Sequence, residues 1–476
     1  MKQFYMLIQL RSNMKNLGIV ICNFNKVDYL KGCLETLYKS NFENLTYDVI
    51  VVDNASTDGS SNFVKNNYPQ IILLENETNT GGSGGFDRGI RYTMQKEYDY
   101  VVLLDNDILL EVNTILNLHK YIKINPKVGV VGSKICTMDN KDILQEMGSF
   151  IDFDNKFNIY TPLKSHKDDN SLPEIVVCDY VPACCMITSK EVLKKVGSFN
   201  THHFIYWDDM DWCTRVKKSG YEIHAINSSR VFHKMGATNH TNTFGFYYFE
   251  RNKIMFFLKY LEDNKFDNFV KSICNWLISL TFFSNLKGNY ATPKSFLCAI
   301  DDLLIGKLGK QDESIFIKEP EQNMFDKYNL ENTDNIIIHM QKNMYSNRRV
   351  YLYLKNFYKN ISIYCDEENY DLIKSNFDER IILQKEFYEI NFKTIFYVQE
   401  HILGFKENKN FDDRYIFIDQ YINVANLNEI KNLHNQYKMY EDIFKNIYQP
   451  VLYKRFELIR TKIRNINEKQ YISFSL

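Results

Sequence analysis

Three side chains in the N-terminal half have the ligand types of a divalent-cation site. Asp105 and Asp107 flank Asn106 directly after the apolar run VVLL, and His233 ends the later run RVFH. Carboxylate oxygens suit Mg²⁺ and Mn²⁺, and imidazole is an acceptable ligand for Mn²⁺. We therefore predict that Asp105, Asp107 and His233 hold one cation, Mn²⁺ or Mg²⁺. An acidic turn and a structural histidine are the alternatives.

A second acidic cluster starts a helix that we predict over Asp208–Ser219. Asp208, Asp209 and Asp211 follow Trp207, and three carboxylates at a helix start also suit the helix dipole. A positioned carboxylate can take the proton of an attacking hydroxyl as a general base. Trp207 offers a flat apolar face of the kind that packs on a sugar ring. The cluster indicates either an acceptor site or simple helix capping.

Two polar segments follow other predicted strands. Asp53 stands in VVDNASTDGS, where it can accept hydrogen bonds from a base or ribose, or assist a helix cap. The segment NTGGSGGF at 79–86 is predicted to be a loop whose backbone approaches a ligand, with a helix starting near Phe86. It is not a Walker loop, and a flexible turn is the alternative. Its candidate ligand-binding residues are Asn79, Gly81, Gly82, Gly84 and Gly85.

Strands and helices alternate through the first part of the chain, which indicates an α/β fold. Apolar runs predict the strands, and leucines at helical spacing predict a helix over Val27–Ser40. Strands without clean alternation fit a parallel sheet covered on both faces, with ligands bound beyond the carboxyl ends of the strands. The predicted strands are Leu17–Asn23, Tyr47–Asp53, Gln70–Leu74, Tyr98–Leu104 and Val128–Ile135.

The pattern is less regular further along, where residues 140–175 are predicted to form a loop or small hairpin. Strand character returns over Ile175–Thr188 around Pro182, and two short strands follow the acidic cluster, Tyr221–Ile226 and Arg230–His233. Three regions result: a catalytic domain at 15–240, a helical extension packed on it at 241–312, and a smaller C-terminal α/β domain of unknown role at 330–476.

The C-terminal region contains five predicted strands and an amphipathic helix. The helix, Val451–Lys469, mixes basic residues with apolar ones at helical spacing. Such a helix can rest on an anionic membrane or pack as an ordinary surface helix. The strands are Asn335–His339, Ile361–Cys365, Ile381–Gln384, Thr394–Gln399 and Tyr415–Asp419.

Charge and cysteine usage narrow the class of protein. The 58 Lys and Arg nearly balance the 59 Asp and Glu, so there is no electrostatic case for a nucleic-acid partner. Ten scattered cysteines without a CxxC pair predict reduced, buried thiols. The apolar run before Met14 is too short for a signal peptide, and we expect no transmembrane helix. We expect a cytoplasmic protein, with or without peripheral contact at the inner membrane face.

Taken together in this order, the motifs resemble the inverting glycosyltransferases of family 2, which have the GT-A (Rossmann-like) fold. The resemblance covers about residues 15–310 and rests on VICNFNK, VVDNASTDGS, NTGGSGGFDRG, LLDND, WDDMDWCTR and VFHK. It looks closest to the bacterial galactofuranosyltransferase and rhamnosyltransferase branch. It implies transfer of galactofuranose, rhamnose or a similar hexose from a nucleotide-sugar donor, with UDP favoured and dTDP next. The acceptor would be a glycan or lipid-linked glycan in cell-surface polysaccharide synthesis.

The resemblance also implies a role for individual residues. Asp209 would be the catalytic base, with Asp208 beside it in the acceptor site. Asp53 would contact the base of the nucleotide, and Asp105 would lie near the ribose and the metal. The remaining residues of the nucleotide-sugar site would be Asn23, Asn79, Gly81, Gly82, Gly84, Gly85 and Trp207.

Two other functions remain open from the sequence. A nucleotidyltransferase would usually have a basic, glycine-rich signature near the N-terminus, and Val20–Lys26 does not supply one. A nucleotide-sugar-binding scaffold without turnover would not need the intact Asp105, Asp107, Asp209 and His233.

Overall fold

A computed structural model describes most of the chain. The described residues are 15–234, 242–287, 289–318, 336–383, 387, 393–406 and 408–466. Residues 1–14, most of the predicted linker before residue 336 and the end of the predicted helix Val451–Lys469 lie outside them. The described residues fall into two compact units, those within 15–273, 294–318 and 452–466, and those within 274–293 and 336–451. Each unit is described separately.

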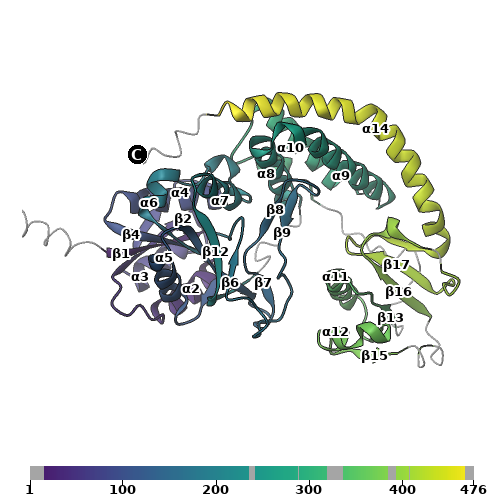
Figure 1. The fold of residues 1–476 in the computed structure, drawn as a ribbon, viewed down its shortest axis with the longest axis horizontal. Helices are drawn as coiled ribbons and strands as arrows, with labels where there is room; N and C mark the ends of the chain where they lie inside the picture. Colours follow the sequence, from purple (N-terminus) through teal and green to yellow (C-terminus); the bar gives the residue numbers. More distant parts are fainter. Residues whose placement is uncertain are drawn as a thin grey trace, which may run out of the picture. The chain divides into compact units, whose positions relative to one another are not determined.

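The first unit is built on a sheet that has ten strands among the described residues (Figure 1). Along its main path the order is β10-β12-β6-β11-β4-β1-β2-β3, while β5 pairs with β12 and β7 with β6. The strands are β1 (Lys15–Asn23), β2 (Tyr47–Asp53), β3 (Ile72–Glu75), β4 (Tyr98–Asp105), β5 (Ile108–Leu110), β6 (Val128–Thr137), β7 (Leu144–Glu146), β10 (Ile175–Val177), β11 (Cys185–Ser189) and β12 (Glu222–His233).

Four neighbouring strands of this sheet have the predicted parallel arrangement. Strands β3, β2, β1 and β4 are parallel neighbours, and β11 is antiparallel to β4 and β6. The five strands predicted before residue 136 are confirmed, with ends that differ by one or two residues. Residues Tyr221–Ile226 and Arg230–His233 form one strand, β12, with a register shift between Ile226 and Arg230. The predicted strand around Pro182 is instead two strands, β10 and β11.

Helices cover both faces of the sheet (Figure 1). Apolar side chains of α2 and α5 share one core with Ile19 and Ile21 of β1. On the other face α4 packs so closely that a side chain at Gly89 would meet Val20. The region 140–175, which was predicted to form a loop or small hairpin, contains the small hairpin β8–β9, and Ser149 directly precedes it. The elements are α2 (Val27–Tyr38), α3 (Ser60–Asn67), α4 (Gly81–Met94), α5 (Thr114–Ile124), α6 (Lys190–Val196), α7 (Asp208–Lys218), β8 (Phe150–Asp152) and β9 (Asn158–Tyr160).

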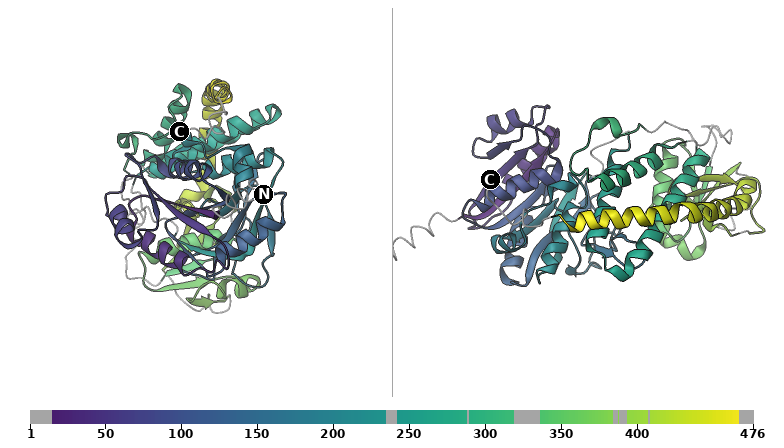
Figure 2. Two further views of the ribbon diagram at one scale, coloured as in Figure 1. Left: turned by 90° about the vertical axis from the view of Figure 1, so that its left-hand side faces the viewer. Right: turned by 90° about the horizontal axis from the view of Figure 1, so that it is seen from above.

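Three helices, of which the first two are rich in aromatic residues, occupy the region predicted as a helical extension. They are α8 (Phe244–Tyr260), α9 (Phe266–Lys287) and α10 (Ala291–Ile305). The unit boundaries differ from the predicted ranges, because residues 274–293 belong to the second unit. They differ again at residue 452, where α14 (Leu427–Arg464) passes from the second unit into the first without a break (Figure 2).

The second unit is a smaller α/β structure with a six-stranded sheet among its described residues. Its strand order is β15-β14-β13-β16-β17-β18, and all neighbours are parallel except β17 and β18. All five predicted strands are present, and β18 was not predicted. The elements are β13 (Ile336–His339), α11 (Met344–Lys355), β14 (Ile361–Tyr364), α12 (Tyr370–Lys374), β15 (Arg380–Ile382), β16 (Thr394–Gln399), β17 (Tyr415–Asp419) and β18 (Val424–Asn426).

The end of α14 packs as part of the first unit. Leu452, Phe456, Ile459 and Ile463 are at most 5% exposed. Arg460 and Arg464 both pair with Asp263 in the same unit. Packing therefore accounts for the amphipathic pattern that suggested a membrane contact. Among the described residues, no helix is both long and apolar enough to span a bilayer.

A buried ion cluster joins α7 to α8. The Asp211 carboxylate is 1% exposed and lies 3.0 Å from both Lys259 Nζ and Arg215 Nε. It also accepts a hydrogen bond from the Tyr260 hydroxyl at 2.8 Å. Although burial opposes ionisation, Lys259 and Arg215 hold the pKa of Asp211 well below its usual range. Asp211 is therefore a structural member of the acidic cluster that the sequence showed at 207–211.

Replacing Asp211 tests this assignment. We expect Asp211→Asn to lower the free energy of unfolding by roughly 3–5 kcal/mol, because it leaves two buried cations without their carboxylate. Urea unfolding followed by the fluorescence of Trp207 and Trp212 measures the change. Asp263→Asn is the matched control: Asp263 also pairs with two arginines but is 82% exposed, so we expect a loss below about 1 kcal/mol. Equal losses in the two variants would contradict the assignment.

Candidate functional site

Strand pairing brings the predicted metal ligands together. Asp105 ends β4, and the chain turns through Asn106 and Asp107 into β5. Strand β5 pairs with β12 so that Ile108 lies opposite His233, the last residue of β12. The backbone N–H of Lys234 donates to the Asp107 carbonyl at 3.2 Å and extends this pairing. Residues more than one hundred positions apart therefore meet at one edge of the sheet.

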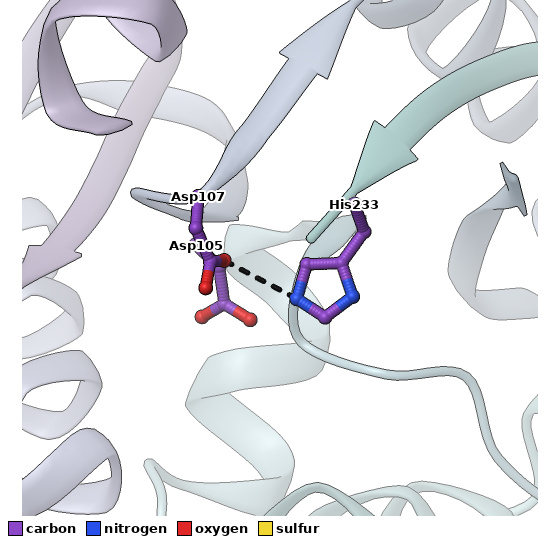
Figure 3. Close-up of side chains that lie close together, drawn as sticks. All are labelled: Asp105, Asp107 and His233. Carbon is purple, nitrogen blue, oxygen red and sulfur yellow. Dashed lines mark ion pairs between the residues drawn. The ribbon is translucent and has the colours of Figure 1, made fainter. Parts of the chain in front are cut away.

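Asp105, Asp107 and His233 have the geometry of a metal site. One ligand atom from each lies within 4.8 Å of the others, and the three side chains converge (Figure 3). His233 Nε2 is 3.2 Å from Asp107 Oδ1. Two carboxylates and an imidazole suit Mn²⁺ well and can also take part in binding Mg²⁺. The donor set therefore fits the predicted cation.

Gln145, a residue that sequence reasoning missed, orients the histidine ring. Its side-chain oxygen Oε1 lies 2.9 Å from His233 Nδ1, so Nδ1 carries the hydrogen and donates. The other ring nitrogen, Nε2, is then the one that faces Asp107. Metal-ligating histidines are commonly held in this way by an acceptor on their second nitrogen. A single glutamine on the short strand β7 gave no sequence signal for this role.

The carboxylates of the site are crowded. Burial and the neighbouring charge of Asp107 raise the pKa of Asp105 to about 7. Burial alone would lower the pKa of His233, but the Asp107 and Asp105 carboxylates raise it. Each group thus responds to a local excess of negative charge. A divalent cation would relieve that excess.

A network of side-chain hydrogen bonds links the ends of three parallel strands. Asn106 donates to Asn23 Oδ1 at 2.6 Å, and Asn23 donates to Asp53 Oδ1 at 2.8 Å. The second Asp53 oxygen accepts from the Ser56 backbone N–H at 3.0 Å, and the Asp53 side chain is buried. The middle residue of the DND motif therefore holds β4 to β1, and Asn23 holds β1 to β2. Ser56 N–H fixes the turn after β2.

The glycine-rich segment is the first part of a helix and not the predicted loop. Helix α4 begins at Gly81, five residues before the predicted start. Asn79 Oδ1 accepts a hydrogen bond from the N–H of Gly81, the first residue of the helix, at 2.8 Å. Close packing explains the glycines: a Cβ on Gly85 would lie 2.2 Å from Cys22 Sγ, and one on Gly84 would lie 2.5 Å from Thr80. A Cβ on Gly82 would meet nothing within 4 Å, so Gly82 borders open space.

The segment before α7 has an unusual backbone. Phe204, Tyr206 and Trp207 have φ values of 67°, 65° and 65°, in the left-handed region. Such residues cost roughly 1–3 kcal/mol each and persist only where the surroundings hold them. The Phe204 carbonyl occupies the space that a Cβ on Gly81 would need, 2.0 Å from its position. Gly81 therefore lets this segment lie directly against the start of α4.

Helix α8 holds this strained segment in place. Asn252 Nδ2 lies within 3.0 Å of three backbone carbonyls, those of His203, Ile205 and Tyr206. Arg251 donates to the carbonyl oxygens of His202 and His203. Both side chains are fully buried. Sequence reasoning missed them because one arginine and one asparagine in an aromatic helix form no recognisable motif.

The held segment ends in the predicted base. Asp208 Oδ2 accepts from Ser83 Oγ of α4 at 2.7 Å, and Asp209 Oδ1 accepts from the Met210 N–H at 2.9 Å. Burial, Asp208 and Glu146 all raise the pKa of Asp209 well above its usual range. Burial also raises the pKa of Glu146 itself, to about 7. Glu146 was not predicted and adds a further carboxylate to the site.

Trp207 does not offer the exposed face that we expected. Its side chain is 0% exposed and packs among Phe249, Phe256 and Phe257. The left-handed backbone at Trp207 directs the indole into the aromatic core under α8. The expectation was wrong because the neighbouring carboxylates suggested a polar surface. Trp207 is instead packed in the aromatic core, directly before these carboxylates in the chain.

Comparison with known proteins gives a family match for the first unit. Residues 18–197 match the model of glycosyl transferase family 2. A low-salt glycan biosynthesis hexosyltransferase of Haloferax volcanii is 22% identical over 298 residues, which is 59% of this chain and 89% of the relative. A rhamnosyltransferase of Escherichia coli is 23% identical over 47% of this chain and 84% of its own length. A galactofuranosyltransferase of Mycobacterium tuberculosis is 24% identical over 34% of this chain and only 28% of its own length.

The role of Gln145 can be tested by metal binding. We expect Gln145→Leu to weaken Mn²⁺ binding roughly 10–100-fold, because His233 loses the acceptor that fixes its ring. Titration of free Mn²⁺ by electron paramagnetic resonance, with and without UDP, measures the affinity. Gln95→Leu, at an exposed glutamine, is the control. Unchanged affinity in Gln145→Leu would contradict the orienting role, and unchanged affinity in Asp107→Ala would contradict the metal site itself.

Proposed function

We propose that this chain, whose residues 18–197 belong to glycosyltransferase family 2, is a metal-dependent inverting hexosyltransferase that acts on a glycan. The donor is a sugar on a nucleoside diphosphate. The observation that carries the proposal is the meeting of Asp105, Asp107 and His233 at one sheet edge. Asp208 lies near enough to this group for its charge to raise the pKa of Asp105. Ligands for a cation and a candidate base thus share one site.

The metal site serves the leaving group. Asp105, Asp107 and His233 would hold Mn²⁺ or Mg²⁺, and the cation would neutralise charge on the departing diphosphate. Gln145 keeps His233 oriented for this task. Asn106 ties the same turn to Asn23, so the ligand atoms are held in position before the donor arrives. Such preorganisation lowers the cost of stabilising charge in the transition state.

The donor site lies beyond the ends of β1, β2 and β4. Asn23 and Asp53 stand at two of these ends and would contact the nucleoside. Helix α4 begins nearby, because Asn54 Nδ2 donates to the Gly81 carbonyl at 2.8 Å. A helix start favours negative charge, and Gly82 leaves its backbone open for a phosphate or the sugar. Asp53 would act with its carboxylate already held by Asn23 and Ser56.

Asp209 would be the general base. A half-buried carboxylate with a raised pKa binds a proton more readily than an ordinary aspartate, which suits proton abstraction from a hydroxyl. Loss of that proton lets the acceptor oxygen attack the anomeric carbon from the face opposite the nucleotide. The anomeric configuration is then inverted in one step. Asp208, held by Ser83, would orient the acceptor beside it.

The relatives suggest the sugar. Their names include a rhamnosyltransferase and a galactofuranosyltransferase, and we propose rhamnose, galactofuranose or a similar hexose for this chain. UDP is the favoured nucleotide, with dTDP second. A glycan or lipid-linked glycan of the cell surface would be the acceptor. A mass-spectrometric screen of nucleotide-sugars with Mn²⁺ identifies the donor by release of the nucleoside diphosphate.

Replacement of the base separates binding from transfer. We expect Asp209→Asn to abolish transfer while donor binding stays normal, because an amide of the same shape cannot take a proton. Calorimetry with UDP and Mn²⁺ measures binding, and an activity assay with the identified donor measures turnover. Asp107→Ala is the complementary variant, in which UDP binding itself weakens. Near-normal turnover in Asp209→Asn would show that another group is the base.

The charge of Glu146 gives a pH test of the same site. A nearby negative charge makes loss of the Asp209 proton harder, so Glu146→Gln should lower the pKa of Asp209. The acidic limb of the kcat/KM profile, measured at saturating Mn²⁺, then moves to lower pH. Glu97→Gln, at a side chain that is 72% exposed at the far end of the sheet, should leave the limb in place. A shift to higher pH, or none, would contradict the pairing of Glu146 with the base.

A further inference from the structure

The second unit has the strand order of a doubly wound sheet. In chain order its parallel strands run 3-2-1-4-5, since β13 lies between β14 and β16. Sheets of this kind bind ligands beyond the carboxyl ends of their strands, near the point where the strand order reverses. The order reverses between β13 and β16, so the segment that follows β16 borders this point and the segment that follows β17 lies next to it.

A cavity of about 460 Å³ lies at these strand ends. His401 lines it from the segment after β16, and Tyr421 and Asn423 from the segment after β17. Trp276 and Phe283 of α9 line the opposite wall, within the part of α9 that belongs to this unit. The ring centroids of Phe283 and His401 are 5.4 Å apart, so the two walls are in contact at one end.

A buried carboxylate shapes one wall of the cavity. Asp419, the last residue of β17, is 0% exposed. Its oxygens accept hydrogen bonds from the N–H groups of Ile402, Tyr421 and Asn423, and from the Asn423 side chain at 3.0 Å. One side chain thus fixes the segments after β16 and β17 relative to each other. The lining residues that follow β16 and β17 are held in place by these contacts.

The lining is aromatic and polar without net charge. Among the described residues that line the cavity there is no Asp, Glu, Lys or Arg. Burial lowers the pKa of His401, and its Nδ1 accepts from the Leu403 N–H at 3.2 Å, which leaves Nε2–H as a donor. Two polar atoms of lining residues, Trp276 Nε1 and Asn423 Oδ1, are buried and have no hydrogen-bond partner among the described residues.

We propose that this cavity binds a neutral carbohydrate, one or more sugar units of a glycan. Sugar rings present apolar C–H faces, which pack on aromatic side chains such as Trp276 and Tyr421. Their hydroxyls both donate and accept hydrogen bonds, which matches the Nε2–H of His401 and the exposed amide of Asn275 in the lining. A nucleotide fits less well, since no cation stands in the lining and the segment MQKN between β13 and α11 has no glycine.

The fluorescence of Trp276 provides a test in the full-length protein. The chain has three tryptophans, of which Trp207 and Trp212 are 0% exposed and Trp276 lines the cavity, so Trp276 is the one that a ligand in the cavity can contact. The probes are neutral oligosaccharides of glucose, galactose, rhamnose and N-acetylglucosamine, with UDP as the charged comparison. EDTA is present and no donor is added, so the outcome does not depend on transfer activity. We expect a saturable shift with at least one neutral oligosaccharide and none with UDP.

Two matched substitutions locate the binding. Tyr421 is 44% exposed at the cavity, and Tyr448 is 47% exposed on α14, outside the lining. Tyr421→Ala should weaken oligosaccharide binding about tenfold, whereas Tyr448→Ala and the ring-preserving Tyr421→Phe should change it by less than about threefold. Absence of binding by every neutral oligosaccharide, equal affinity in the two alanine variants, or a UDP shift lost in Tyr421→Ala would overturn the proposal.

Discussion

The main constraint on the N-terminal site is the free-energy cost of burying several carboxylates close together. Burial and repulsion by neighbouring carboxylates raise the pKa of two of its aspartates, Asp105 beside Asp107 and Asp208, and Asp209 beside Asp208 and Glu146. Buried carboxylates are unfavourable unless donors, cations or protons compensate. The structure supplies donors one by one, as Ser83 does for Asp208 and Ser149 for Glu146. The negative charge that remains uncompensated would be neutralised by the metal that we propose for the donor site.

The same constraint explains why the helices after the sheet belong to the site. Asp209, the proposed base, lies beside other carboxylates that repel it, so its position has to be fixed by the surrounding structure. The left-handed residues Phe204, Tyr206 and Trp207 leave little freedom, and Asn252 of α8 ties their segment down through three carbonyls. Gly81 gives the segment room at the start of α4. A feature that looked like an accessory extension in the sequence is thus a support for Asp209.

The parts of the site that sequence could predict are those that follow strand ends. Asp53 and Asp105 were placed correctly at the ends of β2 and β4 because apolar runs mark buried strands and parallel strands end at one edge. Gly81–Gly85 were assigned to a loop because glycine is a poor helix former. Contact with Cys22 and Phe204 outweighs that preference, and no local pattern reveals such contacts. Gln145 and Asn252 were missed for the same reason, since their roles depend entirely on tertiary neighbours.

The two units apply one rule of sheet geometry to different chemistry. In both, the segments after parallel strands create the site, and a buried aspartate or asparagine at a strand end fixes those segments: Asn23 with Asp53 in the first unit, Asp419 in the second. Topology decides where a ligand can lie, whereas the charge of the lining decides which ligand. The first lining is rich in carboxylates and demands a cation. The second is uncharged and aromatic, so it can hold a neutral sugar chain without competing for the metal or the nucleotide.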